Sequence, residues 1–352
     1  MRLEPTLLEP IFSPRIWGAR SLEPLFPEKT NLAEPLGEAW LTGHDCRMAN
    51  GPYAGRPLGA AWKEMSVEWR GTRLMDAAEF PLLAKFIFPQ DKLSIQVHPD
   101  DEYARKNEQA AGGRGKTEMW YAVVARPGAE LLVGFRKTVT PERFRQALAN
   151  GTLEDLFEHL RVREGDVFFV PAGTPHTIGP GMILCEVQEY SDLTYRVYDY
   201  NRVDFRGKPR ELHVEKALQV MNFTNSRGGE VETLRQERGP LKITFCCACR
   251  YFAVEKWEFR EAVNAATQAE HFDVLIFLAG KGRIRFGDQQ AEYRTGQAWL
   301  LPAGLGAYEL LPQSSTAVTS LLRAYVPEIK EFERNLSNLG VAEAALSKIV
   351  FR

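Results

Sequence analysis

The stretch from Gly165 to His176 constrains the fold of this chain more than any other part of its 352 residues. It contains four consecutive apolar residues, Val167 to Val170, a run that is too short for a helix and typical of a buried strand. Pro171 and Gly173 follow at once and predict a turn. His176 comes directly after this turn, so we expect a rigid sheet to hold its imidazole at the mouth of a β-structure.

Two shorter patterns upstream place further polar side chains on strands. Gln96 and His98 are two residues apart in an extended run, and Lys116 and Glu118 repeat this spacing before an apolar run. Side chains two residues apart in a strand point to the same face, so each pair projects to one side. Together with His176, the set contains two imidazoles, a carboxylate and an amide. It predicts a metal site, suited to Zn²⁺ with an open position or to Fe(II).

The bulk composition favours an ordinary globular protein of two domains. Hydrophobic residues make up 44% of the chain, and its 44 Lys and Arg balance its 46 Asp and Glu. No basic block indicates a nucleic acid or an anionic membrane as partner. The N-terminus lacks the apolar core of a signal peptide, and no long uninterrupted apolar run is present. We therefore expect a cytoplasmic protein.

The five cysteines are odd in number and badly placed for a disulfide framework. Cys246, Cys247 and Cys249 fall in a run from Lys242 to Val254 that we interpret as one buried strand. A Cys-Cys-x-Cys metal site is the more specific functional alternative, but the three cysteines lack the usual C-x-x-C spacing. Small buried hydrophobic residues are the preferred interpretation.

Short apolar runs separated by proline and glycine predict a mainly β chain, which one helical island interrupts. Thr140 is the expected N-cap of a first helix, with Pro141 at its first position. Thr152 has the spacing of a capping box and is expected to open a second short helix. A third helix is predicted over residues 213–220. The expected strands include Ala84 to Phe88, Trp120 to Ala125, Glu130 to Phe135, Val167 to Val170 and Met182 to Val187.

A polar stretch over residues 225–239 is the predicted boundary between a domain at 1–225 and a domain at 240–352. Beyond it the glycine and proline spacing of the first turn recurs, at Gly296, Pro302 and Gly304. Ala307 takes the position of His176, and an approximate alignment puts Phe272 near the place of Glu118. His271 lies close by and is interpreted as a strand-edge residue. We therefore expect the second domain to be structural and to bind no metal.

These motifs resemble a known family. The turn before His176 is similar to the second motif of cupins, which are small double-sheet β-barrels. In more detail, the chain resembles short, bacterial-type class I mannose-6-phosphate isomerases, a zinc-dependent branch of the cupins, over nearly its whole length. The segments that carry the likeness are Pro10 to Gly18, Leu93 to Asp101, Gly115 to Trp120, Pro171 to His176 and Glu186 to Arg202.

The resemblance implies a fold, a function and a set of site residues. The fold would be two jelly-roll cupin barrels, with a helical insertion in the first at about 140–160. The function would be reversible isomerisation of mannose 6-phosphate and fructose 6-phosphate through a cis-enediol. One Zn²⁺ per chain is implied, and the implied residues are His98, Glu118, His176 and Gln96 as ligands, Arg196 and Glu186 as catalytic groups, and Lys116 and Ser94 as substrate-binding groups.

Several alternatives stay open at this point. Arg196 is also consistent with a structural cation stacked on nearby tyrosines and paired with Asp199. Glu186 is equally consistent with an edge position facing water, and it serves as a proton shuttle only if burial raises its pKa. Lys116 is also consistent with a solvated loop lysine. The helical insertion is shorter than in longer family members, so other segments must build part of the pocket wall.

The rival functions are a non-catalytic zinc-containing sugar-binding cupin and an Fe(II) oxygenase on the same barrel. The cationic pair Lys116 and Arg196 argues against the oxygenase, since an O₂ enzyme has no need of a phosphate-ready pocket. The binding protein is expected to lose Arg196 or Glu186, and both are present. The expected partner is a small sugar phosphate, and the expected assembly is a monomer or a weak homodimer.

Overall fold

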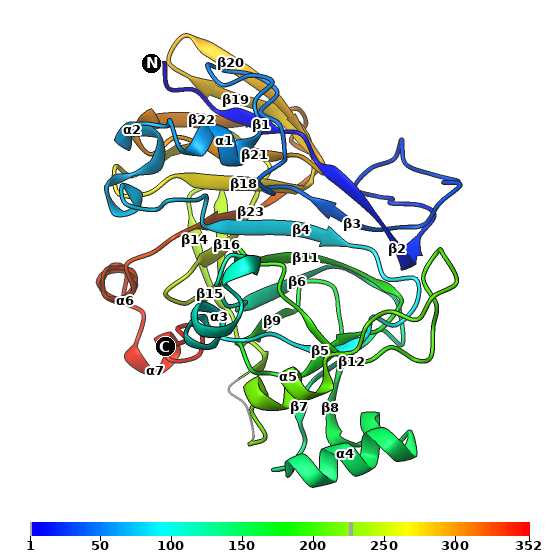
Figure 1. The fold of residues 1–352 in the computed structure, drawn as a ribbon. Helices are drawn as coiled ribbons and strands as arrows, with labels where there is room; N and C mark the ends of the chain where they lie inside the picture. Colours follow the sequence, from blue (N-terminus) through cyan, green and yellow to red (C-terminus); the bar gives the residue numbers. More distant parts are fainter. Residues whose placement is uncertain (1, 225–227) are drawn as a thin grey trace.

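The computed structural model describes residues 2–224 and 228–352, and it consists of β-sheets with short helices at their edges (Figure 1). The strands form two large and two small antiparallel sheets. One large and one small sheet make up each of two units, which follow each other along most of the chain. The mainly β, double-sheet fold expected from the sequence is therefore confirmed.

The first unit contains the turn that precedes His176. Its seven-stranded sheet has the order β13-β9-β6-β11-β4-β3-β2, and its five-stranded sheet has the order β12-β5-β10-β7-β8. The strands of the large sheet are β2 (Ile11–Ala19), β3 (Leu36–Trp40), β4 (Leu82–Ile87), β6 (Glu118–Ala125), β9 (Val167–Val170), β11 (Met182–Glu189) and β13 (Gly229–Glu230). Those of the small sheet are β5 (Ile95–Val97), β7 (Glu130–Phe135), β8 (Phe157–Arg161), β10 (His176–Ile178) and β12 (Tyr195–Tyr198).

The second unit repeats this plan. Its large sheet has the order β1-β21-β18-β23-β16-β15-β14, and its small sheet has the order β17-β22-β19-β20. The large sheet contains β1 (Thr6–Leu8), β14 (Leu234–Arg238), β15 (Leu241–Ala248), β16 (Ala253–Phe259), β18 (Asp273–Ala279), β21 (Ala298–Leu301) and β23 (Thr319–Tyr325). The small sheet contains β17 (Val263–Ala266), β19 (Lys281–Phe286), β20 (Gln289–Arg294) and β22 (Ala307–Pro312).

The predicted domain boundary starts at residues 225–227, which lie outside the described residues. The rest of the expected linker contains two strands, since β13 pairs with β9 of the first unit and β14 pairs with β15 of the second. Strand β1 near the N-terminus pairs with β21, so an N-terminal strand completes the sheet of the second unit. The division at 1–225 and 240–352 stays a prediction, with this one strand crossing it.

Strand β6 shows how the sequence builds two cores at once. Met119 and Tyr121 point into the core shared by the two large sheets, whereas Trp120 and Ala122 point into the interior of the first unit. This alternation follows from the period of two in a strand. Because burial of a large apolar side chain contributes about 1.5–3 kcal/mol, both faces hold the strand firmly. Glu118 starts the strand on the same face as Trp120, and this face looks into the first unit.

The helical island forms as predicted over residues 141–150. In α4 (Pro141–Asn150), the Thr140 hydroxyl accepts a hydrogen bond from the backbone N–H of Arg143 at 3.2 Å, and Gly151 ends the helix with φ of 72°. The second helix is the single turn η3 (Leu153–Leu156), which lacks the predicted cap from Thr152. Helix α5 (Val214–Val220) confirms the third prediction. Figure 1 shows α4 and α5 together at one end of the first unit.

Other helices were not predicted in detail. They are α1 (Leu58–Trp62), α2 (Val67–Arg70), η1 (Thr72–Leu74), α3 (Asp101–Asn107), η2 (Gln109–Ala111), η4 (Ala303–Leu305), α6 (Ile329–Asn338) and α7 (Glu343–Leu346). None of the helices in the described parts of the chain is long and apolar enough to cross a membrane. The cysteines are all free and buried, as expected. The single strand predicted around Cys246 is wrong, because β15 ends at Ala248 and β16 begins at Ala253.

Candidate metal centre and active site

The two sheets of the first unit bring the predicted site residues together from opposite sides. In the small sheet, Gln96 lies directly opposite His176 on one neighbouring strand and opposite Arg196 on the other. The large sheet supplies Glu118 at the start of β6 and Glu186 from the adjacent strand β11. The site therefore lies between the sheets, where antiparallel pairing places side chains that are far apart in the sequence.

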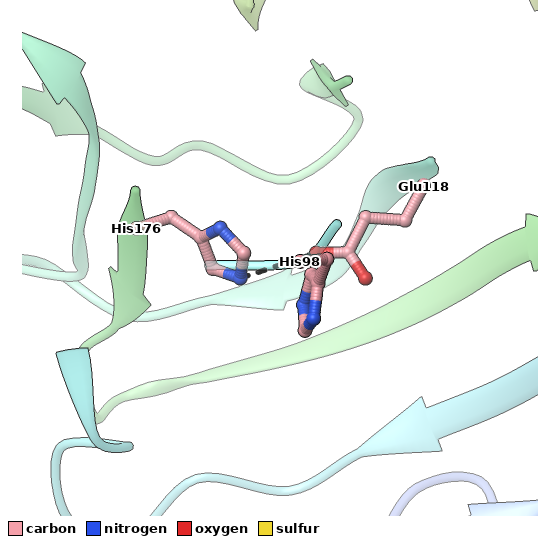
Figure 2. A group of neighbouring side chains, drawn as sticks. All are labelled: His98, Glu118 and His176. Atoms are coloured by element: carbon pink, nitrogen blue, oxygen red, sulfur yellow. Dashed lines mark ion pairs between the residues drawn. The ribbon is translucent and has the colours of Figure 1, made fainter. Parts of the chain in front are cut away.

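His98, Glu118 and His176 form a compact and buried donor set (Figure 2). One ligand atom from each residue lies within 4.8 Å of the other two. The Oε1 atom of Glu118 is 3.3 Å from Nε2 of His176 and 3.8 Å from Nε2 of His98. These three predicted ligands thus converge, with both imidazole Nε2 atoms facing the same carboxylate oxygen.

Backbone carbonyls set the orientation of both imidazoles. Nδ1 of His98 lies 2.8 Å from the carbonyl oxygen of Leu193, and Nδ1 of His176 lies 2.9 Å from that of Thr174. Burial lowers the pKa of His176 to about 4 and that of His98 well below its usual value, so both rings are neutral. With the proton on Nδ1 donated to a carbonyl, Nε2 keeps a free lone pair, which is the arrangement of a metal-ligating histidine.

Glu118 completes the evidence that these residues fit a divalent cation. Its Oε1 atom is fully buried and has no hydrogen-bond donor. Burial raises the pKa of Glu118 to about 8, even though Lys116 acts in the opposite direction. A buried oxygen without a donor is costly, and a cation held by it and by the two Nε2 atoms would remove that cost. Lys116 contacts Glu118 and lies 3.2 Å from Nε2 of His98, so metal loading requires its ammonium group to release these atoms.

Gln96 lies beside this donor set, but its amide nitrogen, and not its amide oxygen, faces His176. Its Nε2 atom is 3.3 Å from Nε2 of His176, and its Oε1 accepts a hydrogen bond from the Ser94 hydroxyl at 3.3 Å. The amide oxygen can join the set only after the side chain turns by half a rotation. The role of Gln96 as fourth ligand stays a prediction.

A cavity of about 450 Å³ lies next to the donor set, which its lining residues Gln96 and Lys116 contact. The five predicted residues that line it come from both sheets and from the loops that join them: Ser94, Gln96, Lys116, Glu186 and Arg196. The structure therefore places all eight residues singled out from the sequence close together, in the donor set or in the lining of this cavity. Lys116 is only 4% exposed, so the interpretation as a solvated loop lysine is wrong.

Glu186 is buried, but its pKa moves in the direction opposite to the one that a proton shuttle needs. Its Oε1 lies 3.5 Å from Nζ of Lys85 and 3.7 Å from Nζ of Lys116, and its Oε2 accepts from the Trp120 indole at 2.9 Å. Burial by itself raises the pKa of Glu186, but the two lysines outweigh it and lower that pKa to about 2. The carboxylate is therefore ionised at neutral pH in this arrangement, and because Glu186 is only 4% exposed, the alternative of an edge position facing water is wrong.

Arg196 is half-buried at the wall of the cavity. Its Nε donates to the Ser94 hydroxyl at 3.3 Å, and its Nη1 donates to the carbonyl oxygen of Glu211 at 3.0 Å. Asp199, which the structural interpretation paired with Arg196, instead accepts from Arg202 at 2.8 Å and from Arg210 at 2.7 Å. Arg196 therefore has neutral oxygen partners, which leaves its charge free to act on a ligand.

Lys85 is a site residue that the sequence analysis missed. It lies opposite Glu186 on the neighbouring strand β4, it is 3% exposed, and it also contacts Asp192 at 3.1 Å. The sequence did contain a sign that Lys85 belongs to the site, since it is the only charged residue in the predicted apolar strand from Ala84 to Phe88. A lysine in a strand buried on both faces needs a buried counter-charge.

The fold and the donor set define a class: a protein of two cupin units, with a buried site for a metal ion and a polar cavity in the first. Comparison with known proteins narrows this class. Residues 7–137 match the family described as phosphomannose isomerase type I, catalytic domain, and residues 242–321 match the mannose-6-phosphate isomerase cupin domain. The chain belongs to the type I mannose-6-phosphate isomerase family, whose members are metal-dependent aldose–ketose isomerases.

Individual relatives support this assignment. The chain is 34% identical over 329 residues to mannose-6-phosphate isomerase ManA of Bacillus subtilis, covering 91% of this chain and all of the relative. A mannose-6-phosphate isomerase of Streptococcus mutans is 34% identical over 310 residues, covering 87% and 95% of the two chains. A crystal structure of the mannose 6-phosphate isomerase from Bacillus subtilis superposes with a TM-score of 0.82 at 30% identity, covering 91% of this chain and 99% of the other.

Proposed function

We propose that this chain interconverts mannose 6-phosphate and fructose 6-phosphate with a bound zinc ion. The observation that carries the proposal is the convergence of His98, Glu118 and His176 next to a cavity whose lining residues Gln96 and Lys116 contact them, and whose wall contains an arginine without a carboxylate partner. A chain that belongs to the isomerase family and keeps this arrangement has the parts that the reaction needs. The alternative, a non-catalytic zinc-containing sugar-binding cupin, would not need a cationic wall beside the metal.

The proposed zinc ligands are His98, Glu118 and His176, with the amide oxygen of Gln96 as the fourth. Support comes from the two imidazoles, whose Nδ1 atoms face backbone carbonyls so that Nε2 is the acceptor, and from the unpartnered oxygen of Glu118. When bound, the ion supplies a Lewis acid that stabilises negative charge on the sugar oxygens. Imidazole and carboxylate donors suit zinc in a site that leaves a position for substrate.

The remaining residues are proposed to act on the open-chain sugar. Moving a proton between C1 and C2 builds negative charge on O1 or O2, and Arg196 can stabilise this charge because no carboxylate neutralises it. Ser94 orients the guanidinium group through its hydroxyl. Lys116 lies at the boundary between the donor set and the cavity, where its ammonium group can bind a sugar oxygen once a metal takes its present partners.

Glu186 was predicted to carry the proton between C1 and C2, but its contacts with two lysines make it a poor base for this step. A carboxylate with a pKa of about 2 is a weak base at neutral pH. We propose that Glu186 acts mainly by helping to keep Lys85 charged and by holding Lys85 and Lys116 in place. It can take up a proton itself only when substrate or metal draws these lysines away from it.

Isomerase activity before and after chelation tests the proposed function. We expect the zinc-loaded protein to convert mannose 6-phosphate, to lose at least about a thousandfold of its rate with a chelator, and to recover with zinc. Manganese and cobalt, added to the same chelated sample, show whether zinc is the preferred ion. A zinc-loaded protein that binds the sugar phosphate without converting it would replace the isomerase by the sugar-binding alternative.

We also propose a cytoplasmic location and a monomer or weak homodimer. The proposed assembly is supported by the large core that the two seven-stranded sheets share, because this core buries the interface between the two units within one chain. A small-molecule sugar phosphate is the proposed partner, with no role for nucleic acid or membrane. Sedimentation of the purified protein at several concentrations measures the assembly.

A further inference from the structure

The lining of the cavity includes residues to which the proposed reaction assigns no role. An arginine-rich segment, residues 199–211, follows β12 and contributes Asp204, Phe205 and Arg210 to the lining. No residue of α4 or η3 lines the cavity in the described parts of the chain. This segment, which we call the flap, therefore builds the part of the wall that the shortened helical insertion does not supply.

The flap is a folded hairpin whose position is set by Asp199. Val203 and Pro209 pair as an isolated bridge, and the backbone N–H of Asp204 donates to the carbonyl oxygen of Lys208 at 2.7 Å. The Asp204 carboxylate accepts from the backbone N–H groups of Arg206 at 2.8 Å and Lys208 at 3.0 Å. The acidic side chain at the tip is thus occupied by its own turn.

Asp199 has one negative charge and two arginine partners. Arg202 and Arg210 both donate to its carboxylate, and Arg202 has a second carboxylate in Asp91 at 3.1 Å. Arg210 engages Asp199 through Nε and Nη2, which leaves Nη1 as a donor that Asp199 does not use. Arg210 lines the cavity, so it combines a position fixed by Asp199 with an Nη1 group that Asp199 does not use.

Most of the other cations that line the cavity also contact a carboxylate. Arg15 is paired with Glu38 at 2.7 Å, Lys85 contacts Asp192 and Glu186, and Lys116 contacts Glu118. Arg196 has only neutral oxygen partners, and after burial the charge that most lowers its pKa is that of Arg210. The charge of Arg196, which no carboxylate neutralises, therefore lies near the Nη1 donor of Arg210 at the wall of the same cavity.

We infer that Arg210 binds the phosphoryl group of the substrate next to Arg196 and selects a phosphorylated sugar over the free sugar. The Nη1 group of Arg210, which Asp199 does not use, can donate to the oxygens of a dianionic phosphate. The exposed ring of Phe205, 56% accessible at the flap tip, offers an apolar wall to the carbon chain. This inference rests on the proposed function, because it takes mannose 6-phosphate as the substrate.

The test is a comparison of Arg210→Gln and Arg210→Lys with the wild type. We expect Arg210→Gln to raise KM for mannose 6-phosphate by about 10- to 100-fold and to change kcat less than about threefold, because a charged contact made in both ground and transition states is lost. Competitive inhibition by inorganic phosphate should weaken by a similar factor. Arg210→Lys should recover part of the loss in KM and part of the loss in phosphate inhibition, since lysine keeps the positive charge but lacks the paired donors of a guanidinium group.

Arg206→Gln is the matched control, because Arg206 is exposed on the same flap and does not line the cavity. Its KM and phosphate inhibition should stay within about twofold of the wild type. A value of KM in Arg210→Gln equal to that of the control, in a folded protein, overturns the inference. If Arg210→Gln does not fold, unchanged phosphate inhibition in Arg210→Lys overturns it equally.

Failure of the proposed function is a separate result. In that case the zinc-loaded wild type would not convert mannose 6-phosphate at all. Inorganic phosphate then serves as the probe in calorimetry, where the wild type should bind and Arg210→Gln should bind at least about tenfold more weakly. Equal binding by both proteins would overturn the role of Arg210 on its own.

Discussion

The first and second units bury charge at matching positions of their large sheets, and the strand register shows the match. Glu118 pairs with Val170, the residue before the turn proline of the first unit. Asp273 pairs with Leu301, the residue before the turn proline of the second. Asp273 is therefore the counterpart of Glu118, at the start of β18 instead of β6.

The neighbouring strands extend the match with reversed charges. Lys85 lies opposite Glu186 in the first unit, and Glu255 lies opposite Arg323 in the second. The cation and the anion have thus exchanged strands. Arg323 contacts Asp273 at 3.0 Å and Glu255 at 3.4 Å, so an internal guanidinium group neutralises the buried acids.

Two further positions show why the units differ in function. Ala307 pairs with Ala266 in the second unit, where His176 pairs with Gln96 in the first. With alanine at both positions, the small sheet offers no imidazole there to face Asp273. His271 lies 3.4 Å from Asp273, and Arg323 supplies the positive charge. The comparison teaches that the same fold can neutralise a buried carboxylate in two ways: with an exchangeable ion, or with a cationic side chain of the protein such as Arg323. We expect only the first unit, which can bind an exchangeable ion, to be catalytic.

The largest effect that tests this comparison is expected from removing one imidazole from each unit. His176→Ala should lower both bound zinc and isomerase activity by at least about a thousandfold, because a ligand is lost. His271→Ala should leave zinc content and the activity of the folded protein unchanged. Metal analysis and initial rates measure both variants. Loss of zinc in His271→Ala would mean that the second unit also takes part in metal binding.

Removal of the internal cation should have the next largest effect. Arg323→Met leaves Asp273 and Glu255 buried and uncompensated, and should lower the free energy of unfolding by about 3–5 kcal/mol. Urea denaturation measures this change, with the exposed Arg283→Gln as control at less than about 0.5 kcal/mol. Adding Asp273→Asn and Glu255→Gln to Arg323→Met should recover part of the loss. A stable single variant would show that Arg323 is not what neutralises these acids.

The smallest effect concerns pH. Burial alone raises the pKa of Asp273, but Arg323 and His271 outweigh burial and hold that pKa below its usual value of 3.8. A lowered folded pKa means that this stabilisation is present above pH 3.8 and is lost as the pH falls through the folded value. The stability difference between wild type and Asp273→Asn should therefore be constant from neutral pH to about 5 and shrink below about 4. A difference that grows on acidification would contradict the assignment.

One of the errors of the sequence analysis arose in this second unit. Its repeat was recognised correctly, but the alignment put Phe272 at the place of Glu118, one residue away from Asp273. A shift of one residue turns a side chain to the opposite face of a strand, so a charged counterpart was overlooked. His271 was taken for a strand-edge residue, yet it is 1% exposed and stacks on Tyr325 with ring centroids 4.4 Å apart.

The sequence by itself determined what depends on neighbours along the chain. Strand alternation gave the shared faces of Gln96 with His98 and of Lys116 with Glu118, and the turn residues located the end of β9. The cap at Thr140 was equally local, because its hydrogen bond reaches only three residues. These features follow from backbone geometry, which the nearest residues control.

Only the tertiary structure decided how these pieces combine. Antiparallel pairing put Arg196, Gln96 and His176 side by side, and it set Lys85 against Glu186. The pKa of Glu186 followed from that contact, since the charges that lower it come from other strands. Electrostatic energies depend on distance in space and on burial, and neither can be read from positions along a chain.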